Sequence, residues 1–156
     1  SDIGLGGSLW SALHGFDHGE LIDVDFEIHK VLADLVISLV FDGTIDGIHD
    51  LSAGGLGVAL AEMVAKSKFG ISTARIPDAR SFFGEGPSRV LVSIDPENVN
   101  DLLSRAEIAN IPATRLGLVG GDRFIVKDLI DVPKETIDLA FVTHLPNALG
   151  AGTISS

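Results

Sequence analysis

The stretch Ile48-His49-Asp50-Leu51-Ser52-Ala53-Gly54-Gly55-Leu56-Gly57 decides the fold, because it joins an expected strand to an expected helix. The run 45–50 favours a strand that ends at the turn. From position 54 onward, apolar side chains recur at the spacing of one helix face, namely Leu56, Leu60, Met63 and Val64. The sequence therefore predicts a strand–turn–helix unit with two glycines at the turn.

This turn is a candidate anion site. The first amides of a helix have no partner within the helix, and the positive end of the helix dipole favours a phosphate or carboxylate there. Glycine lets an anion approach the backbone closely. We therefore expect Ser52, Gly54 and Gly55 to contact a phosphate or another ligand. The alternative is an ordinary tight connection in which Ser52 caps the helix, and the residues alone favour it.

His49 and Asp50 are adjacent on the expected strand, so their side chains should point to opposite faces. They cannot converge with Ser52 into a catalytic triad, and no catalytic residue is predicted. One of them should face the turn, which makes both candidates for orienting it. His14 and His18 are spaced by one helical turn, but Gly15 lies between them and no third ligand is near. No metal site is predicted.

The composition excludes several classes of protein. The chain has 156 residues, which suits one domain spanning 1–156, with flexible ends at 1–7 and 149–156. The net charge of −11 and only 11 basic residues disfavour nucleic-acid binding. The sequence has no cysteine, which fits a cytoplasmic protein, and no apolar run long enough for a membrane span. The start at Ser1, without an initiator methionine, predicts an excised module of a longer chain.

The remaining segments predict an α+β fold with α/β/α layers. About four or five strands should form one mixed or antiparallel sheet flanked by helices. We expect a helix that starts at Asp23 or Asp25 and runs to about 42 to be buried around most of its circumference, and the strand 89–94 to be central. The segment 76–86 should be a loop, and 120–122 suits a hairpin between strands 111–119 and 123–126. The other expected helices are 9–14, 54–68, 95–110 and 133–143, and the other strand is 69–74.

The motif His49-Asp50-Leu51-Ser52-Ala53-Gly54-Gly55-Leu56, followed by the helix start 58–63, resembles a known family. It is similar to the C-terminal module of the aminoimidazole-ribonucleotide-synthetase-like superfamily, and most of all to that of the phosphoribosylformylglycinamidine (FGAM) synthase large subunit. Further blocks with the same resemblance occur in the same order, at 5–8, 83–97, 116–121 and 130–133. The resemblance implies the fold of that C-terminal domain, which is related to a ferredoxin-like topology.

The resemblance also implies a function. Such enzymes are C–N ligases that use ATP, Mg and glutamine to convert formylglycinamide ribonucleotide to the amidine. Their partners are the other modules of the same chain, a glutaminase subunit and a small accessory subunit. The residues that grip ATP and Mg, and the catalytic histidine, belong to N-type modules whose motifs this sequence lacks. His49 is therefore not that histidine, and the chain alone should be inactive, bind no cofactor and wall a ligand cleft.

Two alternatives stay open. The chain resembles the equivalent domain of hydrogenase-maturation or selenophosphate-synthetase-like enzymes, although the block 83–97 and the lack of cysteine favour the purine enzyme. It could instead be a structural or assembly module that only packs against partner domains. Apolar surface without its neighbours predicts self-association. Arg89 is either a phosphate contact or part of a salt bridge at the start of a strand.

Overall fold

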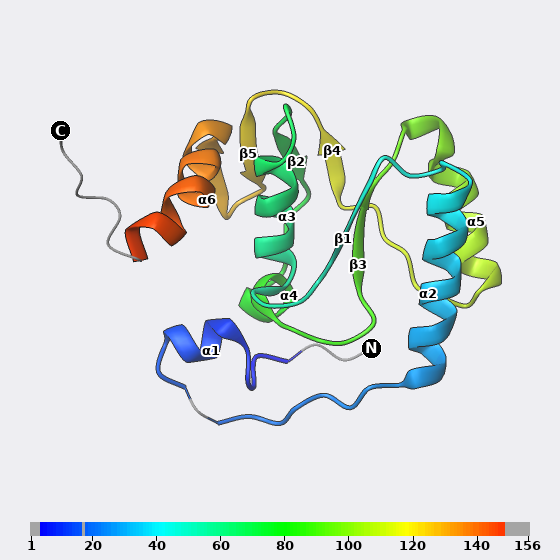
Figure 1. The fold of residues 1–156 in the computed structure, drawn as a ribbon, viewed down its shortest axis with the longest axis horizontal. Helices are drawn as coiled ribbons and strands as arrows, with labels where there is room; N and C mark the ends of the chain where they lie inside the picture. The colour runs from blue at the N-terminus through cyan, green and yellow to red at the C-terminus, as the bar shows by residue number, and fades with distance from the viewer. Residues whose placement is uncertain (1–3, 17, 149–156) are drawn as a thin grey trace. The chain divides into compact units, whose positions relative to one another are not determined.

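A computed structural model describes residues 4–16 and 18–148 (Figure 1). Its contacts divide the chain into two compact units, Ser1–Ala59 with Pro77–Arg115 and Leu60–Ile76 with Leu116–Ser156. A single domain over 1–156 stays a prediction. Of the expected flexible ends, 1–7 and 149–156, residues 1–3 and 149–156 lie outside the described residues. None of the helices in the described ranges combines the length and the apolar character needed to span a bilayer.

The first unit contains a two-stranded antiparallel sheet, in which β1 (Gly47–Asp50) pairs with β3 (Val90–Ser93). Its helices are α1 (Leu9–Leu13), α2 (Phe26–Phe41), α4 (Ala79–Phe83) and α5 (Val99–Ile108), with a 3-10 turn η1 (Pro96–Asn98) before α5 and the start of α3 (Gly55–Ala65). The prediction that 89–94 is a central strand is wrong, because among the described strands β3 pairs only with β1.

Side-chain caps explain where several helices of the first unit begin. The Asp25 carboxylate accepts hydrogen bonds from the amides of Glu27 and Ile28 at 3.0 and 3.1 Å, and so starts α2. Ser8 and Asp95 cap α1 and η1 in the same way. These starts confirm the expected helices. Helix α4 was not expected, since 76–86 was predicted to be a loop, but Asp78 caps it.

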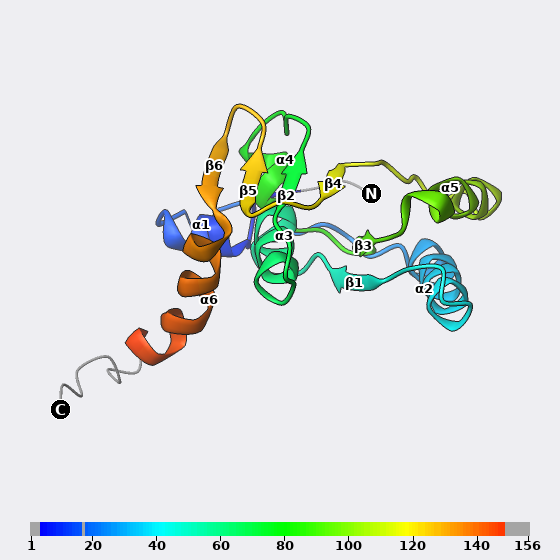
Figure 2. The same ribbon diagram turned by 90° about the horizontal axis from the view of Figure 1, so that it is seen from above.

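Helix α2 corrects another expectation. Leu32 and Leu39 are buried, but Phe26, Ile37 and Phe41 are 77%, 64% and 90% exposed. The prediction that this helix is buried around most of its circumference is therefore wrong. Only one of its faces packs within the unit, where α2 lies beside α5, as both Figure 1 and Figure 2 show.

The second unit is built on a four-stranded mixed sheet in the order β4-β2-β5-β6, which Figure 2 shows. Its strands are β2 (Ile71–Thr73), β4 (Gly117–Val119), β5 (Arg123–Val126) and β6 (Ile130–Pro133), followed by α6 (Lys134–Ala148). Strand β2 pairs antiparallel with β4 and parallel with β5. The predicted hairpin between β4 and β5 is therefore wrong, and β6 was not expected.

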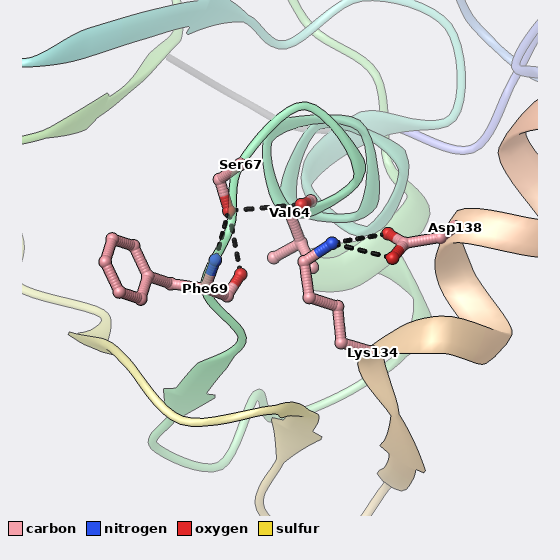
Figure 3. Close-up of polar contacts among 5 residues, drawn as sticks. All are labelled: Val64, Ser67, Phe69, Lys134 and Asp138. Carbon is pink, nitrogen blue, oxygen red and sulfur yellow. Dashed lines mark hydrogen bonds and ion pairs between the residues drawn. The ribbon is translucent and has the colours of Figure 1, made fainter.

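Two polar clusters fix the ends of helices in the second unit (Figure 3). After α3, the Ser67 hydroxyl donates to the Phe69 carbonyl oxygen at 2.7 Å, lies 3.1 Å from that of Val64, and accepts from the Phe69 amide at 3.1 Å, so it holds the chain as it leaves the helix. At the start of α6, the Lys134 ammonium donates to both carboxylate oxygens of Asp138 at 2.6 and 2.8 Å.

The α+β class is confirmed. The number of sheets differs from the expectation, because the six strands in the described residues form two sheets, of which the four-stranded one is mixed. The core of the second unit includes Leu60, Val64, Ile71, Phe124 and Val126. In the first unit, Phe82 is buried against Gly57, where an added Cβ would lie 2.7 Å from the ring. The start of α3 is therefore tightly packed.

Candidate functional site

The strand–turn–helix unit exists as predicted. Strand β1 ends at Asp50, the Leu51 amide donates to the Arg89 carbonyl oxygen at 3.1 Å, and α3 begins at Gly55. The Gly55 amide donates to the Ser52 carbonyl oxygen at 3.0 Å, which closes the turn. The turn therefore lies at the end of a strand and opens a helix of 11 residues.

The two glycines of the turn are required by internal packing. Their φ values are +81° at Gly54 and +61° at Gly55, a region that L side chains rarely adopt. A Cβ at Gly55 would lie 2.6 Å from the Gly84 carbonyl oxygen, and one at Gly54 would overlap the Val58 side chain. Gly54 and Gly55 are buried, whereas Ser52 is exposed. Of the three predicted contact residues, Ser52 alone presents a side chain to solvent.

Glu85 is the residue that sequence reasoning missed. One of its carboxylate oxygens accepts from the Gly54 amide and from the Leu9 amide, each at 2.8 Å. Its backbone also pairs with Gly4, with N–O distances of 2.9 and 3.2 Å. The chain's own carboxylate thus occupies one amide that the sequence assigned to an external anion. The only signal was an acidic residue between two glycines, Gly84 and Gly86, in the block 83–97.

His49 and Asp50 lie directly before the turn. His49 is half-buried and Asp50 exposed, which agrees with the expected opposite faces. The imidazole nonetheless reaches its neighbour, because Nδ1 lies 2.6 Å from the Asp50 carbonyl oxygen and 3.7 Å from its Oδ1. Since a carbonyl oxygen can only accept, Nδ1 carries the proton in this contact. The ring therefore holds the last peptide of β1.

Arg89 directly precedes β3 and contacts the loop before it. Its guanidinium donates to the Gly84 carbonyl oxygen at 3.1 Å, and burial lowers the pKa of this group. It forms no ion pair with any residue that the structure describes, so the salt-bridge alternative is not found there. Arg89 instead supports the loop that carries Glu85.

Two amides of the turn have no acceptor. Within the described part of the chain, the N–H groups of Leu56 and Gly57 donate no hydrogen bond, although both residues are buried. Buried amides are nearly always paired, so these two donors are unusual. No group of three or more His, Asp or Glu side chains able to hold a metal ion occurs among the described residues.

Comparison with known proteins decides the family. Residues 1–128 match the family model of the AIR synthase related protein, C-terminal domain. The chain belongs to this family. Relatives named phosphoribosylformylglycinamidine synthase subunit PurL include one from Nocardioides sp., 35% identical over 149 residues, covering 94% of this chain and 19% of the relative. One from Erythrobacter litoralis is 36% identical over 137 residues, covering 82% of this chain and 18% of the relative.

These comparisons confirm the resemblance to FGAM synthase. The chain spans about a fifth of the length of the relatives it matches. Among solved structures, phosphoribosylformylglycinamidine synthase II from Thermotoga maritima aligns with a TM-score of 0.65 at 23% identity, covering 76% of this chain and 22% of that chain. T. maritima PurL complexed with ATP aligns with a TM-score of 0.61 at 23% identity, over 70% of this chain and 21% of that one. This likeness supports the fold.

Proposed function

We propose that this chain is the C-terminal module of the large subunit of an FGAM synthase. The full enzyme would use ATP and glutamine to convert formylglycinamide ribonucleotide to formylglycinamidine ribonucleotide. The observation that carries this proposal is the match to enzymes of that name at 35% identity over 94% of the chain. The relatives reported above carry the name of the purine enzyme and so favour it over the hydrogenase-maturation and selenophosphate-synthetase alternatives.

Within that enzyme, the turn at Ser52, Gly54 and Gly55 would contact a phosphate-bearing ligand. Two observations support this role. Ser52 is exposed, and the amides of Leu56 and Gly57 are unpaired within the described part of the chain. A helix start with open donors is the kind of site where phosphates bind. His49 and Asp50 would orient this turn.

The cofactors and partners belong to the full enzyme. T. maritima PurL has been solved with ATP and with ADP, and a PurLQS structure is also known from that organism. We infer that the full protein uses ATP with Mg, works in the cytoplasm, and assembles with a glutaminase subunit and a small accessory subunit. The chain alone would be inactive, because its sequence lacks the ATP-gripping motifs of the N-type modules.

The test is a chimaera in which this chain replaces the matching fifth of the Nocardioides PurL. We expect the chimaera to form the amidine with ATP, and the isolated chain to show no turnover. Ser52→Ala in the chimaera should lower kcat/KM by about tenfold or more, because one hydrogen bond to a charged group contributes about 1.5–3 kcal/mol. Ser104→Ala, on the exposed side of α5, is the matched control. Turnover by the isolated chain would refute the predicted inactivity.

A second candidate is a purely structural module, and one observation favours it. The Glu85 carboxylate accepts a hydrogen bond from the Gly54 amide, so the chain itself pairs this donor, as expected of a purely structural turn. In that case Ser52→Ala and Ser104→Ala would change the activity of the chimaera equally little. Phosphate added to the isolated chain would then leave the amide NMR signals of residues 52–57 unshifted.

A further inference from the structure

The dipeptide Asp-Gly occurs twice in the sequence, at Asp42-Gly43 and at Asp46-Gly47. An aspartate followed by glycine is prone to spontaneous isomerisation, because glycine has no side chain to shield its amide nitrogen from the neighbouring carboxyl group. Both dipeptides lie in the first unit, on either side of the short link between α2 and β1. Their chemistry is the same, so any difference in their reactivity has to come from the contacts that surround them.

The first dipeptide is held at the end of α2. The Asp42 carboxylate accepts a hydrogen bond from the Arg105 guanidinium of α5 at 2.6 Å, and the two groups form an ion pair. The Gly43 amide donates to the Val40 carbonyl oxygen at 3.1 Å. Both reacting groups are therefore engaged. The Asp42 carboxyl carbon can reach the Gly43 nitrogen only after the ion pair and this turn have opened.

The second dipeptide lies where the chain enters β1. Asp46 is exposed, and its carboxylate forms no hydrogen bond or ion pair with any residue that the structure describes. Gly47 is the first residue of β1, opposite Ser93 of β3. The end of a short strand opens locally at little cost in free energy. The Asp46 carboxyl group is thus free to turn toward the Gly47 nitrogen.

We propose that Asp46 is the main site of isomerisation in this chain and that Asp42 is protected by its ion pair. The Gly47 nitrogen attacks the side-chain carboxyl carbon of Asp46, a C–N bond forms, and the amide proton leaves with the carboxyl hydroxyl as water. Water then adds to one carbonyl of the resulting succinimide ring. Where it adds to the main-chain carbonyl, the original peptide bond breaks and the chain continues through the side chain as an isoaspartate.

The isoaspartate adds one methylene to the main chain directly before β1. In the structure, the Asp46 amide donates to the Ser93 carbonyl oxygen at 2.8 Å, and Gly47 is paired with the same residue. An extra backbone carbon between Asp46 and Gly47 cannot keep both relations, so the start of β1 should loosen from β3. The modification therefore affects the strand that leads into the glycine turn.

Prolonged warm incubation of the 156-residue chain in a mildly acidic buffer tests the proposal, because the neutral carboxyl group is the form that loses its hydroxyl as water. Peptide mapping with electron-transfer fragmentation distinguishes aspartate from isoaspartate at each position. We expect isoaspartate to form at Asp46 at least about twofold faster than at Asp42, a factor within the range of one exposed ion pair. Asp46→Glu should abolish the signal at this position, because glutamate would have to close a larger ring.

Arg105→Ala removes the ion pair and should speed isomerisation at Asp42 about two- to fivefold, with the rate at Asp46 unchanged. Asp101→Ala is the matched control, because Asp101 binds the same guanidinium at 2.9 Å and its loss leaves the Asp42 contact in place. Circular dichroism checks that both variants are folded.

The chain unfolded in urea provides a reference that needs no substitution. Because the contacts that distinguish the two dipeptides are lost there, Asp42 and Asp46 should react at similar rates. Equal rates in the folded chain, or faster reaction at Asp42, would overturn the proposal. A preference for Asp46 that persists in urea, or an unchanged rate at Asp42 in Arg105→Ala, would do the same.

Discussion

Gly55→Ala should be among the most damaging small substitutions in this chain. Gly55 opens α3 with a φ of +61°, and a Cβ there would lie 2.6 Å from the Gly84 carbonyl oxygen and 2.9 Å from the Phe83 carbonyl carbon. Both obstacles are backbone atoms, which cannot rotate away as a side chain could. Alanine at this position therefore requires the loop that carries Glu85 to move.

Two effects of Gly55→Ala should lower the free energy of unfolding. Holding an L residue in the left-handed region costs about 1–2 kcal/mol. Forcing the backbone of Gly84 and Phe83 apart adds about 1–3 kcal/mol, by analogy with overpacked cores. The sum, about 2–5 kcal/mol, is a large fraction of the stability of a typical domain.

Gly43→Ala isolates the steric part. Gly43 has a φ of +68°, nearly that of Gly55, but no atom lies within 4 Å of the point that a Cβ would occupy there. This variant should lose only the conformational part, about 1–2 kcal/mol. Urea unfolding followed by circular dichroism measures both losses, and the midpoint of Gly55→Ala should lie about 1 M below that of Gly43→Ala. Equal midpoints would refute the argument from close packing.

Three further predictions concern charged groups. Glu85→Ala should lower the free energy of unfolding by about 2 kcal/mol or more, because two amides lose a charged acceptor. Glu85→Gln keeps an oxygen at this position and should cost less. Urea unfolding measures both losses, and equal losses would contradict this prediction. Asp138→Ala removes the partner of the Lys134 ammonium, on a side chain that is only 13% exposed, and should cost about 1–2 kcal/mol. Asp131→Ala breaks the exposed pair with Arg123 and should cost less than about 0.5 kcal/mol in the same assay. Hydrogen bonds from Ser81 lower the pKa of Asp78 below its ordinary value of 3.8. The Asp78 carboxylate therefore stabilises the fold fully above pH 3.8, and this contribution is lost as the pH falls through the lowered pKa. The difference in thermal midpoint between wild type and Asp78→Asn should therefore shrink from pH 7 to about pH 3, and a constant difference would contradict it.

Local signals were sufficient for much of the first unit. The caps at Ser8, Asp25 and Asp95 act on amides two or three residues away, so the sequence itself shows where these helices begin. The turn between β1 and α3 is equally local. The short helix α4 has the same kind of cap at Asp78, but the glycines and proline around it concealed it.

Contacts between distant segments could not be predicted. Gly120 and Gly121 suit a hairpin by their own chemistry, yet they pair with Gly70, with N–O distances of 2.9 and 2.8 Å. Strand β2 lies between β4 and β5 and forms backbone hydrogen bonds with both. The exposed face of α2, with Phe26, Ile37 and Phe41, could not be predicted for the same reason. Apolar residues all around a helix indicate burial, but they do not say which face finds its partner within the unit.

The candidate site shows how the two proposed roles compete for the same atoms. A phosphate that bound the Gly54 amide would have to displace a carboxylate that the chain itself holds at 2.8 Å. A phosphate on the amides of Leu56 and Gly57 would leave Glu85 in place, but its charge would lie close to that carboxylate. In both cases Glu85 opposes the ligand, so removing its charge should strengthen phosphate binding if the turn is a ligand site. If the turn is only a scaffold, the same change weakens the fold and phosphate still does not bind.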